Sequence, residues 1–201
     1  MSIEYLLKEY ELSYKQLQYY DDRQNDLMKY TFTLTSSVAT AQFAVFKFFN
    51  GVTKDFFTFQ TTLSVIVFVS TLLLYLAMLQ NRIYFVYMAR QLNAIRGYLM
   101  ATEAAGFHNN QLYTSTNFSP LKPSSVHTFQ LLGVTFISSL FAGISAYAFS
   151  SALGNDCSIF IACIVAAVVE IAELLGGIIY LSSANKKTAD HAVHGKSDKS
   201  E

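Results

Sequence analysis

The chain has 201 residues, of which 52% are hydrophobic and 14% charged, and its 14 Lys and Arg balance 14 Asp and Glu. Soluble domains have a similar apolar content but about 25% charged residues. The mean hydropathy of +0.31 disfavours a disordered chain. The formal net charge of zero excludes binding to a polyanion by bulk electrostatics, so we expect no direct nucleic-acid binding.

The few charges leave long apolar segments. No Asp, Glu, Lys or Arg occurs in residues 30–46, 56–81 and 123–155, and only Glu170 and Glu173 interrupt a fourth apolar segment. A membrane-spanning helix needs about 20 mostly apolar residues, whereas a helix of a soluble bundle needs a charged face. The sequence therefore predicts an all-α integral membrane protein with about four transmembrane helices, at residues 29–49, 57–80, 128–153 and 158–182.

The first of these segments is unusually polar, because threonines, serines and Gln42 occur throughout it. Thr35 and Gln42 are therefore candidate intramembrane polar or pore-lining residues. The polarity is also compatible with a buried or re-entrant helix that does not cross the membrane.

The basic residues predict the orientation. Four precede the first segment, four lie between the second and third, and four follow the last, whereas only Lys47 and Lys54 fall on the opposite side. The positive-inside rule then places both termini and the central region in the cytoplasm. No charged-then-apolar leader precedes the first segment, so we expect no cleavable signal peptide.

The chain divides into five parts on this basis. We expect a cytoplasmic amphipathic helix at 1–28, a first transmembrane hairpin at 29–80, a cytoplasmic helix-loop insertion at 81–127, a second hairpin at 128–183, and a disordered cytoplasmic tail at 184–201. The loop at 106–127 contains both prolines and one charge. We expect it to be ordered over the cytoplasmic end of the bundle, covering a ligand pocket or binding a partner; the simpler interpretation is a tether between hairpins.

The N-terminal helix has an apolar stripe that requires a partner. Its members at near-helical spacing are Ile3, Leu6, Leu7, Tyr10, Tyr14 and Leu17. Helices that lie on membranes favour Lys and Arg on their polar face, whereas six acids and four bases occur in this region through Lys29. Packing against protein is therefore favoured over packing on the bilayer surface.

The second transmembrane helix is expected to continue into the cytoplasm, because no proline and no glycine before Gly97 interrupts residues 81–105. Its apolar face would carry Tyr84, Phe85, Met88, Leu92, Ile95 and Leu99. Arg82, Asn93 and Arg96 would lie on the opposite face with Arg90 beside them. These four residues are candidates to contact lipid headgroups, to pair with Asp21, Asp22 and Asp26, or to bind a phosphate-bearing ligand.

Glu170 and Glu173 lie in the middle of the last apolar segment, three residues apart, so that their carboxylates occupy neighbouring faces of a helix. Intramembrane carboxylates are unfavourable and mark functional sites by default. They are candidates to line a cation or proton path, to form a ring in an oligomer, or to accept hydrogen bonds from hydroxyls of the first segment. A structural clamp between helices is an equally good interpretation.

No catalytic or metal-binding motif is present. The sequence contains no Walker loop, GxSxG, HExxH or dinucleotide fingerprint, and the four histidines have no metal-ligand spacing with the cysteines. Cys157 and Cys163 would lie about 9 Å apart on one helix, which is too far for a disulfide. We expect no catalytic residue, no metal and no cofactor.

Residues 81–96, with the sequence NRIYFVYMARQLNAIR, close a helical hairpin and resemble small membrane effectors of bacterial antiphage systems, those that accompany retrons and CBASS-like nucleotide-signalling operons. The order of amphipathic helix, membrane hairpin and polar cytoplasmic loop is also similar over about the first 105 residues. The resemblance implies a non-enzymatic effector in the bacterial inner membrane. Such a protein permeabilises or depolarises the membrane on a cytoplasmic cue and causes growth arrest or death of infected cells.

The expected partners are membrane lipids, further copies of the chain in a homo-oligomer, and a soluble cytoplasmic protein or signalling ligand. Two alternative functions remain open. One is a membrane-anchored sensor or regulatory subunit that binds a soluble partner, and the other is a small ion channel or transporter. The absence of an inverted repeat disfavours a transporter.

Overall fold

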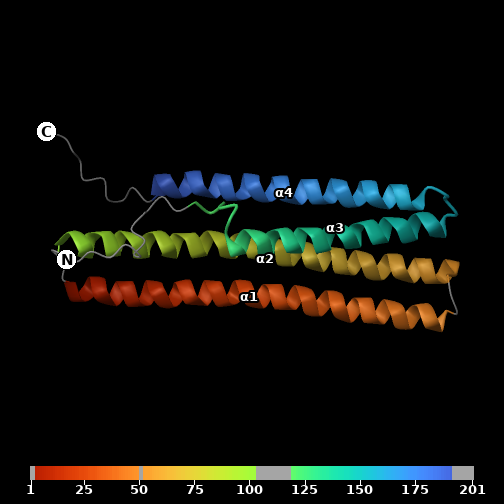
Figure 1. The fold of residues 1–201 in the computed structure, drawn as a ribbon, viewed down its shortest axis with the longest axis horizontal. Coiled ribbons are helices and arrows are strands. Elements are labelled where there is room, and N and C mark those ends of the chain that lie inside the picture. Colours follow the sequence, from red (N-terminus) through yellow and green to blue (C-terminus); the bar gives the residue numbers. More distant parts are fainter. Residues whose placement is uncertain (1–2, 50–51, 103–118, 192–201) are drawn as a thin grey trace.

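The computed structural model describes residues 3–49, 52–102 and 119–191, with side chains described as far as residue 101 and from 119 to 184. These residues form four helices, α1 (Ile3–Phe48), α2 (Lys54–Thr102), α3 (Val126–Ala152) and α4 (Ser158–His191) (Figure 1). The described part of the chain contains no strand, so the expected all-α fold is confirmed. α2, α3 and α4 are long and apolar enough to cross a membrane. α1 does not meet that criterion, and a fourth crossing is therefore not established.

The helices run antiparallel to their chain neighbours, in the order α1, α2, α3 and α4 (Figure 1). α2 packs against both α1 and α3, and α4 packs mainly on α3. Within the described residues α1 and α4 do not contact each other. The last turns of α1 and α3 and the first turns of α2 and α4 lie at one end of the molecule (Figure 1). At the other end the α1–α2 hairpin extends beyond α3 (Figure 1), because α1 and α2 are about 70 Å long and α3 only about 40 Å.

α1 is one continuous helix rather than a cytoplasmic helix followed by a separate transmembrane segment. Its least exposed residues recur in alternating steps of four and three, at Leu6, Tyr10, Ser13, Leu17, Tyr20, Gln24, Leu27 and Thr31. A 3.5-residue period keeps one stripe facing a partner helix along its whole length, and here that partner is α2.

The N-terminal part of α1 therefore packs against protein, as expected. Only three of the six residues predicted for its apolar stripe face the partner helix. Leu6, Tyr10 and Leu17 lie on the packed side, whereas Ile3, Leu7 and Tyr14 are exposed. Ser13 and Glu9 occupy packed positions that apolar spacing alone does not select, and the Glu9 carboxylate accepts a 2.6 Å hydrogen bond from Gln91 of α2.

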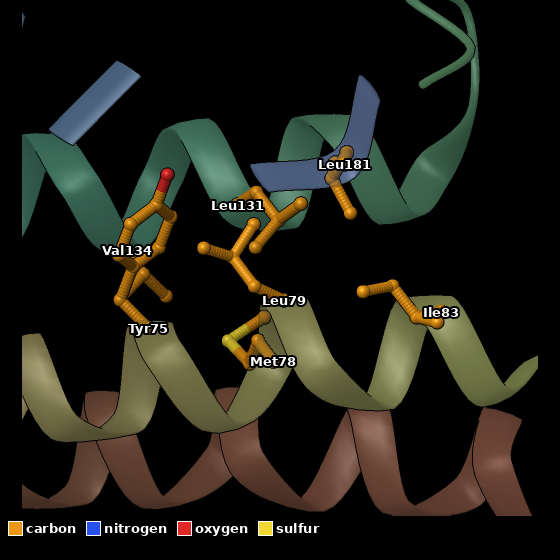
Figure 2. Packing of buried hydrophobic residues seen from close by; sticks show 7 residues of the cluster. All are labelled: Tyr75, Met78, Leu79, Ile83, Leu131, Val134 and Leu181. Atoms are coloured by element: carbon orange, nitrogen blue, oxygen red, sulfur yellow. The ribbon is translucent and has the colours of Figure 1, made fainter. Parts of the chain in front are cut away.

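The core lies where α2, α3 and α4 meet (Figure 2). It comprises Tyr75, Met78, Leu79, Ile83, Leu131, Val134 and Leu181. Burying a large apolar side chain contributes roughly 1.5–3 kcal/mol relative to water. Inside a bilayer the lipid is also apolar, so van der Waals packing and hydrogen bonds hold helices together instead.

The end of α2 agrees with expectation, whereas the start of α3 and the end of α4 differ from it. α2 continues past residue 80 to Thr102, as expected. α3 begins earlier than expected because the Ser125 side chain caps it by accepting a hydrogen bond from the Thr128 N–H. α4 continues to His191, so the expectation of a disordered tail is wrong for residues 184–191. Residues 192–201 and residues 103–118, which include part of the expected loop at 106–127, lie outside the described residues.

Candidate functional site

Both glutamates of the apolar helix α4 face α3. The Glu173 side chain is buried, and its Oε1 accepts a 2.7 Å hydrogen bond from Ser138 Oγ. One turn earlier, Glu170 Oε1 accepts a 3.0 Å hydrogen bond from Thr135 Oγ1. Residues three apart on each helix thus form two adjacent polar contacts. The hydroxyl donors come from α3 and not from the first segment, which corrects one of the roles expected for these carboxylates.

A tyrosine from α2 completes this arrangement. Its ring extends from α2 towards α3 and α4 (Figure 2), and the Tyr75 hydroxyl donates a 2.8 Å hydrogen bond to the backbone carbonyl of Glu173. This approach requires a glycine at position 177, because a Cβ there would collide with the Tyr75 hydroxyl. A further close approach occurs at Gly143, where a Cβ would lie 3.0 Å from the Ala166 Cβ.

Each glutamate retains one oxygen without a partner. Within the described residues, Oε2 of Glu170 and Oε2 of Glu173 are buried and accept no hydrogen bond. A buried carboxylate oxygen without a partner is unfavourable by several kcal/mol in an apolar medium. Glu173 also borders a groove of about 800 Å³ between α2 and α4. Apolar side chains such as Leu72 and Leu76 form most of the rest of the groove wall.

Thr35 and Gln42 do not belong to this polar cluster. The Thr35 hydroxyl donates to backbone carbonyls of its own helix, at 2.9 Å from Thr31 and 3.1 Å from Phe32. The Gln42 amide donates to Ser64 of α2 at 3.4 Å. Both therefore lie within the α1–α2 hairpin, and α1 does not contact α4 in the described part of the chain.

A second site lies at the end of the molecule that carries most basic residues. A cavity of about 330 Å³ there is lined by Arg82, Asn93 and Arg96 of α2. Lys122, Ser125 and His127, which precede or begin α3, contribute polar groups from the other side. Arg90 is not among the residues that line this cavity. Three of the four candidates on α2, Arg82, Asn93 and Arg96, are thus brought together.

The face of α2 that carries the two cavity arginines is covered by other parts of the chain. Arg82 is only 1% exposed, and its Nε donates a 2.9 Å hydrogen bond to the Pro120 carbonyl. Arg96 donates from Nε and Nη2 to the Tyr10 hydroxyl at 3.2 and 3.0 Å. Asn93 is also buried. These side chains lie inside the structure because α1 covers one side of α2 and residues 119–127 cover another.

Two of the three acids of α1 that were candidate partners for the arginines contact other side chains. Asp21 Oδ1 lies 3.2 Å from His127 Nε2 of α3, and Asp26 pairs with Lys29 one turn away at 3.0 Å. Asn81 donates to the Tyr20 carbonyl at 2.8 Å and to the Gln24 amide oxygen at 2.9 Å. The contacts of Asp21 and Asn81 join α1 to α3 and to α2 beside the cavity.

Sequence reasoning missed the residues that hold the candidates in place. Thr135 and Ser138 have the same spacing of three as the two glutamates, and this match in neighbouring apolar segments is a usable signal. Tyr75, Lys122 and His127 carry no comparable signal, because only the packing of α2 against α3 brings them to the two sites.

Comparison with protein-family models, with curated proteins and with solved structures found no significant match to this chain. Within the described residues, no three His, Cys, Asp or Glu side chains gather in a way that holds a metal ion. Cys157 and Cys163 are exposed and free. The functional argument therefore rests on the two carboxylates of α4 and on the cavity lined by Arg82, Arg96 and Lys122.

Proposed function

We propose that this protein is a non-enzymatic membrane effector that permeabilises or depolarises the membrane in response to a cytoplasmic cue. In this proposal it spans the bacterial inner membrane four times, with both termini and the α1–α2 extension in the cytoplasm. The distribution of Lys and Arg supports the orientation, because Lys47 and Lys54 are the only basic residues near the short connections. The resemblance of residues 81–96 to antiphage effectors supports a role in antiviral defence, with growth arrest or death of infected cells as the outcome.

The hydrogen bonds of its hydroxyl groups support a crossing by α1 despite its polarity. Thr31, Thr35 and Thr40 each donate to a carbonyl four residues earlier in the same helix. Hydroxyls satisfied in this way are much less unfavourable in lipid than free ones. α1 also packs along α2, which itself has the length and hydropathy of a membrane span.

The observation that carries the proposal is the pair of half-satisfied carboxylates between α3 and α4. Glu170 and Glu173 each have one hydroxyl donor on α3 and one buried oxygen without a described partner. α4 packs on little besides α3. A small displacement of α4 would therefore open a polar, acidic surface inside the bilayer, where water and cations can bind.

A direct physical connection links this surface to the cytoplasmic cavity. Tyr75, which holds the Glu173 backbone, and Arg82, which lines the cavity, are seven residues apart on the continuous helix α2. Seven residues are two helical turns, or about 10 Å. A shift or rotation of α2 caused at the cavity would move the Tyr75 hydroxyl away from α4.

A conducting path requires several copies of the chain. In the described residues α1 and α4 lie on opposite edges and do not touch, so the four helices do not close a ring around a channel. We therefore propose a homo-oligomer in which the acidic surfaces of neighbouring copies line the path.

The test is the membrane potential of cells that express the protein under an inducible promoter, followed with a potential-sensitive dye. We expect induction to depolarise the cells, and we expect Glu170→Gln and Glu173→Gln to reduce this effect together with the conductance of reconstituted liposomes. Glu11→Gln is a matched control, because Glu11 is an exposed acid of α1. Unchanged depolarisation in both glutamate variants, with normal membrane insertion, would overturn the proposed role of the carboxylates.

One observation favours the alternative of a sensor or regulatory subunit. The part of α1 that extends beyond α3 exposes several large apolar side chains, among them Tyr5, Leu7 and Leu12. A soluble protein bound there would co-purify with the chain, and liposomes would show no conductance. Steady ion flux in liposomes without any cue would instead favour the ion channel or transporter.

A further inference from the structure

Cationic side chains line the cavity at the cytoplasmic end, beside the apolar side chains of Leu17, Phe85 and Leu92. Arg82, Arg96 and Lys122 line it from two separate segments, and among the described residues no carboxylate lines it. Asp21 contacts one of the lining residues, with its Oδ1 3.2 Å from His127 Nε2. Three like charges around one small cavity repel one another, so an anion placed among them would stabilise the structure.

The first turn of α3 adds to this field. Ser125 caps the helix and His127 follows in the first turn, and both line the cavity. The N-terminal end of a helix carries a partial positive charge and backbone N–H groups without helical partners, which makes it suited to phosphate binding. The cavity thus combines a helix N-terminus with a buried guanidinium, because Arg82 is only 1% exposed.

We propose that this cavity binds a phosphate group. Guanidinium groups match phosphate oxygens in shape and charge, and a volume of about 330 Å³ accommodates a phosphate with part of the molecule that carries it. The phosphate belongs either to an anionic lipid headgroup, since Arg82 directly follows the apolar part of α2, or to a soluble phosphate compound. Binding does not depend on the proposed permeation, so the two proposals can fail separately.

Purified full-length protein in phosphatidylcholine nanodiscs tests the proposal through its thermal unfolding midpoint, Tm. In one arm inorganic pyrophosphate is added, and sodium chloride at matched ionic strength is the reference. In the other arm phosphatidylglycerol replaces part of the phosphatidylcholine. A rise in Tm with pyrophosphate identifies a soluble phosphate compound as the class of ligand, and a rise only with phosphatidylglycerol identifies the headgroup. Either result supports the phosphate site.

Two variants locate the binding. Lys122→Gln removes an exposed lysine and leaves the packing intact, and Arg96→Gln removes a guanidinium from the cavity. We expect each to weaken binding roughly tenfold, the usual effect of one charge-assisted hydrogen bond. Arg23→Gln is the matched control, because Arg23 is an exposed arginine of α1 that does not line the cavity.

The proposal is overturned if neither phosphate probe raises Tm above the chloride reference. It is also overturned if Lys122→Gln and Arg96→Gln respond to both probes as strongly as Arg23→Gln does, because binding would then lie elsewhere on the surface. Conductance measured on the same preparations reports on permeation independently.

Discussion

α1 and α4 lie on opposite edges of the molecule (Figure 1), and the threonine hydroxyls of α1 and the carboxylates of α4 form their hydrogen bonds in different ways. The polar residues of α1 are spread along the helix, and its threonine hydroxyls donate to carbonyls of α1 itself. α4 concentrates its polarity in Glu170 and Glu173, whose described hydrogen-bond donors are on α3. Polar groups satisfied within one helix tolerate movement of that helix. The carboxylates of α4 depend on donors from α3, so displacement of α4 breaks their hydrogen bonds. The α3–α4 contact is therefore sensitive to movement of α4.

The largest expected effect is at Ser138. Ser138→Val removes the hydroxyl donor and leaves the buried Glu173 carboxylate without it, which we expect to lower the free energy of unfolding by about 3 kcal/mol. Denaturant unfolding in detergent micelles measures this change.

Glu173→Leu is the informative counterpart to Ser138→Val. Replacing a buried ionisable group by an apolar one is often neutral or stabilising, so we expect this variant to unfold no more easily than the natural chain while losing conductance. A loss of stability equal to that of Ser138→Val would show that the carboxylate is a structural clamp.

The close contact between α3 and α4 gives the next largest effect. A Cβ at Gly143 would lie 3.0 Å from the Ala166 Cβ and 3.1 Å from the Ala162 carbonyl oxygen. We expect Gly143→Val to push the helices apart and destabilise the protein by about 2 kcal/mol. Gly176→Ala is the matched control, because nothing lies within 4 Å of a Cβ there. This variant should be neutral or slightly more stable, and equal destabilisation by both would contradict the packing argument.

A smaller effect is expected where α1 is held to α2. Asn81 donates to the Tyr20 carbonyl and to Gln24, so Asn81→Ala should cost about 1.5 kcal/mol through the buried acceptors it leaves behind. Limited proteolysis within α1 should become faster. An unchanged proteolysis rate would show that the rest of the long contact with α2 suffices to hold α1.

The threonines of α1 should be less sensitive. Thr40 donates to the Ser36 carbonyl of its own helix, which already has its helical partner. We expect Thr40→Val to change the free energy of unfolding by less than about 0.5 kcal/mol. A larger loss than that of Asn81→Ala would contradict the contrast between α1 and α4.

The smallest effect concerns the exposed pair Lys15 and Glu11. The Lys15 ammonium lies 2.6 Å from the Glu11 carboxylate and lowers the pKa of Glu11. The small stabilisation is therefore present above the ordinary pKa of Glu11 and is lost as the pH falls through the lowered pKa. Lys15→Gln should raise the pKa of Glu11 towards its ordinary value in an acid titration followed by carboxyl NMR. An unchanged pKa would show that the pair does not persist in solution.

The sequence by itself determined the helical class, the approximate spans at 57–80, 128–153 and 158–182, and the continuation of α2 beyond residue 80. These features follow from hydropathy and from the absence of helix breakers, which are local properties of the chain. It also identified Glu170 and Glu173, because charge within an apolar segment is visible without a structure.

Only the tertiary structure decided which neighbours these residues have. Helical periodicity places Arg82 and Asn93 on a face of α2, but it does not say whether that face is covered, and here α1 and residues 119–127 enclose it. The same holds for Tyr75, Thr135 and Ser138, whose roles arise from contacts between helices distant in sequence. The physical reason is that burial depends on the packing of all elements together, whereas the periodicity of one helix defines only its own faces.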